Sequence, residues 1–237
     1  MLRLRTFGGL SLFRGSENLT GAVTQRRRLA ILALLAVARD TGVSRDKLLA
    51  YLWPESDQER ARHVLNQLLY AQRRQVRSDA LFTGRKTLRL NREVIGTDVG
   101  EFEEALERGA LEEGVALYGG PFLDGFFLKD APEFEEWVAG HRERLARRCL
   151  DALQSLGESA VTAGKVQEAV RWWRRAADLD PFDSAVALAL VRALEGAGDR
   201  PGALRHARQH ADTLRTQLGV SPDPAFGRVL SGLEGAV

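Results

Sequence analysis

A tripeptide pattern recurs after 34 residues in the C-terminal part of this chain of 237 residues. Residues 163–165 read Ala-Gly-Lys and residues 197–199 read Ala-Gly-Asp, while Ala169 recurs as Ala203 at the same offset. Small residues at such positions let paired helices approach closely, and stacked helix pairs bury one continuous apolar core. The period therefore predicts an all-α domain built from repeated helix–turn–helix units.

The N-terminal part has a different pattern, in which strands precede helices. Residues 2–7 and 10–14 alternate apolar and polar side chains, which predicts a short antiparallel pair, and a weaker third strand is expected over residues 17–23. Apolar residues with helical spacing follow, and Thr24 and Ser44 are the expected N-caps of the first two helices. The three helices are expected over residues 25–40, 45–53 and 58–78.

Two short alternating runs, residues 79–83 and 86–91, come after the third helix and predict a hairpin with its bend at residues 84–86. Strands, three helices and a hairpin in this order are typical of a winged helix-turn-helix. We therefore expect a mainly α fold with a small β component. A winged helix-turn-helix domain over residues 1–97 would precede an all-α, tetratricopeptide-like repeat domain over residues 98–237.

Charge is distributed unevenly along the chain. Residues 1–98 hold 18 Lys and Arg against 9 Asp and Glu, a net charge of +9. The remaining residues hold 16 and 23, a net charge of −7, so the overall charge is only +2. A compact unit with a large positive charge attracts polyanions, and nucleic acid is the leading candidate.

The predicted third helix has two contrasting faces. Leu65, Leu68 and Leu69 form an apolar stripe, whereas the opposite face carries amide, phenol and guanidinium groups. In a winged helix this helix enters the major groove of DNA, where Asn66 and Gln67 match adenine N6 and N7, and the arginines of the first helix contact the backbone. The residues expected to bind DNA are Arg26, Arg27, Arg28, Ser44, Arg45, Arg62, His63, Asn66, Gln67, Tyr70, Arg73, Arg74, Arg85 and Lys86.

Composition excludes several other classes of protein. An apolar content of 44% and a charged content of 28% describe an ordinary globular chain. The one cysteine, Cys149, excludes an intramolecular disulfide and a multi-cysteine metal cage, which fits a reducing compartment. No run approaches 18 apolar residues and the N-terminus lacks a signal-peptide core. We therefore expect a cytoplasmic protein without a membrane partner.

Features that resemble enzyme sites do not assemble into a catalytic set. Residues 157–166 have the wrong glycine spacing for a phosphate-binding loop, and Val166 stands where a hydroxyl group would hold magnesium. His206 and His210 have a zinc-compatible spacing, but no third ligand is evident in the sequence. We expect no catalytic activity, no cofactor and no metal.

Two groups of stretches, which together cover nearly the whole chain, resemble a known family. The first group is LRLRTFGGLSL, QRRRLAILALLA, SRDKLLAYLWP, ERARHVLNQLLYAQRRQV and TLRLN, and the second is DVGEFEEAL, LYGGPFLDGF and EFEEWVAGHRERLARRCLDAL. The first group resembles the OmpR-like winged helix of the SARP-type bacterial transcriptional activators, and the second resembles the bacterial transcriptional activator domain that follows it in that family. Ala71 and Gln72 depart from the family, which usually has a basic residue and a leucine there. Larger relatives carry an ATPase domain after the repeats, and we expect none here.

The resemblance implies a transcription factor that binds direct repeats in promoters as side-by-side protomers and contacts RNA polymerase. It places Arg62, Asn66, Gln67, Tyr70 and Arg73 on the recognition helix, and Arg85 and Lys86 on the wing. It places residues 54–58 in the loop with which OmpR-like proteins contact polymerase.

Two other functions stay open from the sequence. Repression would use the same DNA-binding surface at a site that overlaps polymerase. A protein–protein adaptor would instead use the groove of the helical repeats, but it would not need basic residues on the first helix, the third helix and the wing together.

Overall fold

The structure of the chain, a computed structural model, describes residues 1–19 and 26–235. The expected N-cap Thr24 and the end of the third predicted strand, residues 20–23, lie outside the described residues. Contacts divide the chain into two compact units, Met1–Leu145 and Ala146–Val237.

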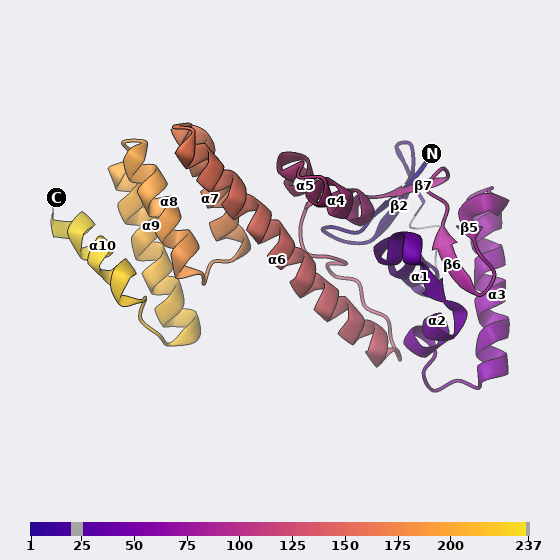
Figure 1. Ribbon diagram of the computed structural model, residues 1–237. Helices are drawn as coiled ribbons and strands as arrows, with labels where there is room; N and C mark the ends of the chain where they lie inside the picture. Colours follow the sequence, from indigo (N-terminus) through magenta and orange to yellow (C-terminus); the bar gives the residue numbers. More distant parts are fainter. Residues whose placement is uncertain (20–25, 236–237) are drawn as a thin grey trace. The chain divides into compact units, whose positions relative to one another are not determined.

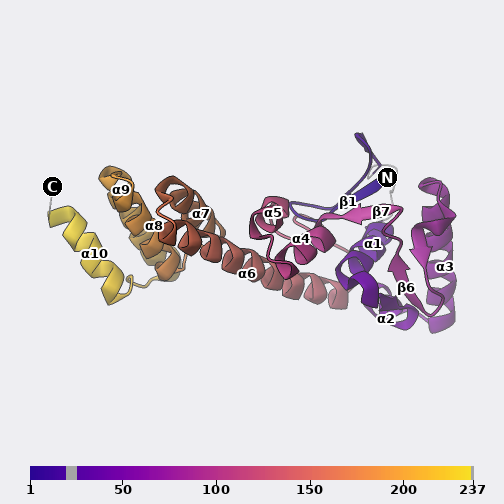
Figure 2. The same ribbon diagram turned by 45° about the horizontal axis from the view of Figure 1, so that its top comes forward.

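The first unit contains two small sheets. Its strands are β1 (Leu2–Arg5), β2 (Ser11–Arg14), β3 (Glu17–Asn18), β4 (Val43–Ser44), β5 (Phe82–Thr83), β6 (Thr87–Leu90) and β7 (Ile95–Thr97). One sheet has the order β3-β2-β1-β7 and the other has the order β4-β6-β5. The predicted pair of β1 and β2 is confirmed as antiparallel, with Leu4 opposite Leu12. Parallel pairing of β7 with β1 was not predicted, and Figure 2 shows these two strands side by side.

Helices pack around these sheets. The helices of the first unit are α1 (Arg26–Ala38), α2 (Arg45–Leu52), α3 (Gln58–Gln75), α4 (Asp98–Glu107), α5 (Leu111–Leu117) and the first part of α6 (Pro132–Thr162). Every residue of α1 from Leu29 to Ala36 is buried, as expected for a helix that is apolar on all sides. The Ser44 hydroxyl accepts a hydrogen bond from the Lys47 amide at 3.2 Å, which confirms Ser44 as the N-cap of α2.

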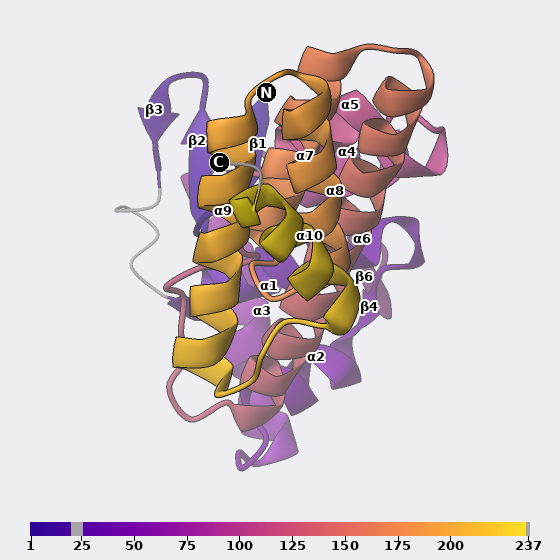
Figure 3. The same ribbon diagram turned by 90° about the vertical axis from the view of Figure 1, so that its left-hand side faces the viewer.

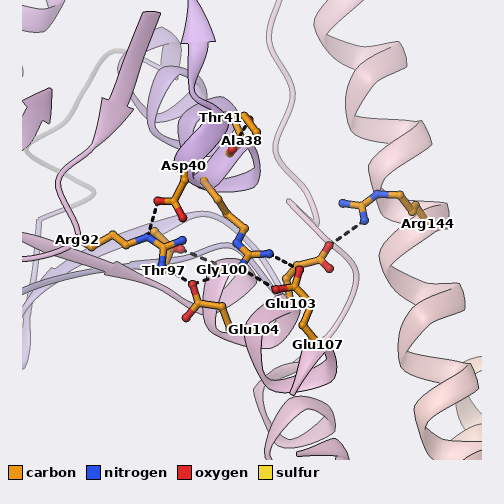
Figure 4. Close-up of polar contacts among 11 residues, drawn as sticks. Ala38, Asp40, Thr41, Arg92, Thr97, Gly100, Glu103, Glu104, Glu107 and Arg144 are labelled. Atoms are coloured by element: carbon orange, nitrogen blue, oxygen red, sulfur yellow. Dashed lines mark hydrogen bonds and ion pairs between the residues drawn. The ribbon is translucent and has the colours of Figure 1, made fainter. Parts of the chain in front are cut away.

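Ion pairs join the end of α1 to α4 (Figure 4). Arg39 has a left-handed backbone, with φ of 50°, and its guanidinium group pairs with Glu107 and Glu104. Arg92, from the turn between β6 and β7, pairs with Glu104 at 2.5 Å. The winged helix and α4 therefore belong to one packed unit.

The connector between α5 and α6, residues 118–131, buries most of its large apolar side chains. Phe122 and Leu123 are fully buried there, and the Phe122 ring packs 5.8 Å from the Trp137 ring of α6. Among the phenylalanines of the connector, Phe127 differs from Phe122 and Phe126, because 64% of its surface is exposed.

The second unit consists of antiparallel helices (Figures 1 and 3). After the end of α6 these are α7 (Val166–Leu179), α8 (Ser184–Gly196), α9 (Arg200–Thr213), a π-helical turn (Leu214–Leu218) and α10 (Pro224–Gly235). Ala169 of α7 and Ala203 of α9 are both buried, and Gly164 and Gly198 close the preceding turns with left-handed φ of 68° and 76°. The predicted helix–turn–helix repeat is confirmed.

Candidate nucleic-acid interface

The helix α3 is amphipathic, and its two faces are those expected from the sequence. Leu65, Leu68 and Leu69 are buried. On the opposite face Asn66 and Gln67 are exposed, and 61% of the surface of Tyr70 is open to solvent. The outward face therefore offers hydrogen-bonding groups at the surface of the first unit.

The start of α3 is held by a side-chain cap. Asp57 Oδ1 accepts hydrogen bonds from the amides of Glu59 and Arg60, each at 3.0 Å. The preceding residues 54–58 form a turn whose side chains are largely exposed. The helix thus begins at Gln58, directly after this cap, and its polar face starts within the first two turns.

The hairpin of β5 and β6 forms the wing, and Gly84 allows its tight bend. Gly84 has a φ of 83°, and a Cβ atom there would lie 2.0 Å from the Thr87 carbonyl oxygen, so only glycine fits. Arg85 and Lys86 follow at the tip and are exposed. The Arg45 amide donates to the Lys86 carbonyl oxygen at 3.0 Å, which ties the wing to the start of α2.

A cleft of about 650 Å³ lies between α3, the start of α2 and the wing. Five of the predicted DNA-binding residues line it, and these are Ser44, Arg45, Arg62, Asn66 and Lys86. The structure therefore brings together residues that lie up to 42 positions apart in the sequence. Asp46, Leu65 and Thr87 complete the lining.

Polar contacts order the side chains of this surface. Arg45 Nη1 donates to Asn66 Oδ1 at 2.8 Å, and Arg62 Nη2 pairs with Asp46 Oδ1 at 3.2 Å. Gln67 Nε2 lies 2.8 Å from His63 Nε2, one helical turn earlier. Several of the predicted DNA-binding side chains thus already have protein partners.

The three arginines at the start of α1 do not line this cleft. Arg26 Nη1 donates to the Phe127 carbonyl oxygen at 2.7 Å, and Arg27 donates to the Leu52 carbonyl oxygen at 3.1 Å. Arg28 Nη1 donates to Gln75 Oε1 at 3.3 Å. These side chains hold the connector, α2 and α3 against α1, and their contact with phosphate stays a prediction.

The arginines near the end of α3 differ from one another. Arg74 is exposed, whereas Arg73 is half-buried and its guanidinium group lies 5.7 Å from the centre of the Phe82 ring. Gln72 is buried and donates from Nε2 to the Arg28 carbonyl oxygen at 2.7 Å.

Asp46 is a residue of this surface that the sequence reasoning missed. An acidic side chain was not expected within a cationic surface, yet its carboxylate holds Arg62. The position of Asp46 could have been noticed in the sequence, because it lies two residues after the N-cap Ser44 and acidic residues favour the first turn of a helix.

Three residues of the second unit with chemically reactive side chains, His206, His210 and Cys149, lie in half-buried or buried positions. His210 is buried, with Nδ1 3.1 Å from the Pro181 carbonyl oxygen and Nε2 2.9 Å from the Ser184 hydroxyl group. Burial lowers the pKa of His210 and of His206, and it raises the pKa of Cys149 to about 12. Within residues 1–19 and 26–235 no group of three or more His, Cys, Asp or Glu side chains is arranged to hold a metal ion.

A family model described as the bacterial transcriptional activator domain matches residues 89–233. The matched range begins in β6 and ends in α10. No curated protein matches the chain. Among the described helices, none is both long enough and apolar enough to span a bilayer.

The fold is similar to that of EmbR from Mycobacterium tuberculosis, whose structure was solved in complex with a low affinity phosphopeptide. The TM-score is 0.64, and the match covers 99% of this chain and 65% of the EmbR chain. With 19% sequence identity, the likeness concerns the fold. This chain thus spans about two thirds of the length of that solved relative.

Proposed function

We propose that this chain, which belongs to the bacterial transcriptional activator domain family, is a SARP-type regulator that binds promoter DNA sequence-specifically and activates transcription there. One observation carries the proposal: the exposed polar face of α3 lies beside a cleft that contains Arg45 and Lys86. The residues of the winged helix, 1–97, would bind DNA, and residues 98–237 would act in activation.

The proposed docking places α3 in the major groove. The groove is about 12 Å wide and admits an α-helix, and α3 has 18 residues with a continuous outward face. The wing, with Arg85 and Lys86 exposed at its tip, would then lie against the phosphate backbone or the adjacent minor groove.

Contacts with base edges would come from the middle of α3, where Asn66 and Gln67 are exposed. Tyr70 and His63 would contact phosphates or base edges, and Arg62, Arg73 and Arg74 would bind guanine or phosphate. Ser44 and Arg45, at the start of α2, would contact the backbone from the other side of the cleft. Arg26, Arg27 and Arg28 would add backbone contacts only if their bonds within the protein open.

Electrostatic attraction would supply most of the affinity. The net charge of +9 over residues 1–98 favours a polyanion, and each neutralised phosphate releases condensed counterions. For about 6–10 phosphate contacts, the affinity should fall about 10³–10⁵-fold between 50 and 200 mM salt.

RNA polymerase is the proposed partner in activation. The turn of residues 54–58 is exposed and carries Glu55 and Asp57, so polymerase could reach it while α3 is bound to DNA. We further propose that two protomers bind side by side on direct repeats, as the family resemblance implies. Repression from the same DNA site is the alternative outcome of such binding.

A second candidate function is that of a protein–protein adaptor, and one observation favours it. The second unit has a groove of about 390 Å³ whose lining includes Val161, Trp173, Ala189 and Ala193. Such a surface fits an apolar segment of a partner protein. The adaptor function does not explain the polar face of α3.

Selection of bound sequences from a random DNA pool by the full-length chain tests the proposal. We expect enrichment of one motif, arranged as a direct repeat, with binding that weakens steeply with salt. In transcription with purified RNA polymerase, the selected site should raise the yield of transcript from a weak promoter. Equal binding of selected and random DNA at low salt would contradict the proposal and favour the adaptor.

A further inference from the structure

Arg45 connects the wing to the recognition helix. Its backbone amide donates to the Lys86 carbonyl oxygen at 3.0 Å, and its Nε donates to the Arg85 carbonyl oxygen at 2.7 Å. Its Nη1 donates to Asn66 Oδ1 at 2.8 Å. Arg45 is thus held to the wing at two points, by its backbone amide and by the Nε of its guanidinium group, and the same guanidinium group presents a further donor to α3.

The contact with Arg45 determines how the Asn66 amide is oriented. A guanidinium group has five donors and no acceptor, so only the amide oxygen of Asn66 can face it. The Nδ2 group then lies on the other side of the amide and carries two N–H donors. Asn66 is exposed, so these donors are available to a ligand in the groove.

The base edges of the major groove differ in what they can accept. Guanine presents two acceptors, N7 and O6, and adenine presents the acceptor N7 beside the donor N6. Thymine presents the acceptor O4, and cytosine presents only the N4 donor. A residue that offers only donors therefore discriminates in favour of guanine and against cytosine.

We propose that Arg45 is a positioning residue that presents Asn66 to DNA as a hydrogen-bond donor, so that Asn66 reads guanine rather than adenine. The inference rests on the proposed DNA-binding function and specifies how it is carried out. It replaces the paired adenine contact expected for Asn66 from the sequence. That contact requires Oδ1 to accept from adenine N6, but Oδ1 is held by a cation that also repels the amino group.

Gln67 provides an internal comparison. Its amide contacts His63, a ring whose nitrogen atoms donate or accept according to the tautomer, so this contact does not fix the direction of the Gln67 amide. The polarity of Asn66, in contrast, follows from a partner that can only donate.

The experiment compares the DNA motifs that the full-length protein and its variants select from a random pool. Substitution Asn66→Ala first identifies the base position that Asn66 specifies, because that position should lose its preference. The wild-type protein should prefer guanine there by about tenfold. Asn66→Asp keeps an acceptor for Arg45 but presents an oxygen to the groove, so the preference should change to cytosine.

Substitutions of Arg45 test the positioning role directly. Arg45→Ala frees Asn66 Oδ1, so the preference at the same position should shift toward adenine. Arg45→Lys keeps a donor for Oδ1 and should keep guanine. Lys47→Ala removes a neighbouring exposed charge of α2 outside the cleft, and it should leave every base preference unchanged. Thermal unfolding of each variant shows that it is folded.

The possible results distinguish a failure of the proposed DNA-binding function from a failure of the positioning role of Arg45. Selection of no motif by the wild-type protein would overturn the proposed function, and this inference with it. A selected motif with adenine at the position of Asn66, or an Arg45→Ala variant that weakens all sites equally without a change of base, would overturn the positioning role alone. A loss of fold in Arg45→Ala leaves Asn66→Asp to decide, because retained guanine preference in that variant also overturns it.

Discussion

Asp98 holds Thr6 through both its hydroxyl group and its backbone amide. The Thr6 hydroxyl donates to Asp98 Oδ1 at 2.6 Å, and the Thr6 amide lies 2.8 Å from Oδ2. The amides of Phe7 and Val99 donate to the same carboxylate at 3.0 and 2.8 Å. Burial raises the pKa of Asp98, and these donors oppose that change. The first residue of α4 is thereby joined to the end of β1.

Asp98→Ala should lower the free energy of unfolding by about 2–4 kcal/mol, because it leaves several buried donors without a partner. Urea denaturation followed by circular dichroism measures this. The matched control is Glu101→Ala, which removes an exposed carboxylate of the same helix from its pair with Arg3. That control should cost less than about 1 kcal/mol. Equal effects of the two substitutions would contradict the role given to Asp98.

Local patterns made much of the fold predictable. The pair of β1 and β2 follows from alternation over adjacent residues, and the start of α2 follows from the hydroxyl group of Ser44. The helical repeat follows from a period that recurs within the chain. In contrast, β7 is three residues long and pairs in parallel with β1, more than 90 residues earlier, so no local sequence pattern predicts this pairing.

The candidate site likewise contains features that local sequence patterns predict and contacts between distant residues that they do not. The exposure of Asn66 and Tyr70 followed from the helical period, because the leucines of α3 define the buried face. The partners of Arg26 and Arg27 did not follow, because they include the carbonyl oxygens of Phe127 and Lys129 in the irregular connector, about 100 residues away. The contact between Arg45 and Asn66 depends in the same way on how the wing folds back.

Two histidines, the buried His210 and the half-buried His206, make the second unit sensitive to acid. Burial lowers the pKa of His206 and His210 below the ordinary value of 6.5, so in mild acid the unfolded chain binds protons that the folded chain excludes. The free energy of unfolding should therefore fall as the pH is lowered from 7.5 to 5.5. Urea denaturation at several pH values measures the slope.

A double variant, His206→Gln with His210→Gln, checks the origin of this slope. Its free energy of unfolding should depend less on pH between 7.5 and 5.5 than that of the wild-type protein. Above pH 7.5, where both histidines are neutral in either state, the two proteins should respond alike. An unchanged slope in the double variant would assign the acid sensitivity to other groups.

Cys149 should not react with thiol reagents in the folded protein. Its side chain is 1% exposed, and burial raises its pKa to about 12, so both access and thiolate are lacking. With Ellman's reagent at pH 8, the native chain should release almost no chromophore, and addition of urea should release one equivalent. Rapid reaction of the native protein would show that the helices around Cys149 open on the time scale of the assay.

Two glycines of α6 should respond to alanine in opposite ways. A Cβ atom at Gly157 would lie 2.6 Å from the Trp173 ring, because the indole packs directly on the helix backbone. Gly157→Ala should therefore displace the indole and lower the free energy of unfolding by about 1–3 kcal/mol. A Cβ atom at Gly140 meets nothing within 4 Å. Gly140→Ala should raise the free energy of unfolding by about 0.5–1 kcal/mol, since alanine favours a helix.

Urea denaturation compares the two variants, and tryptophan fluorescence of the folded proteins reports on the indole. Only Gly157→Ala should change the native emission, because Trp173 is the side chain that must move. Truncating the indole tests the cause, since Trp173→Leu should make Gly157→Ala nearly neutral when the two are combined. If Gly157→Ala costs the same with and without the indole, the close contact between Gly157 and Trp173 is not the source of the loss.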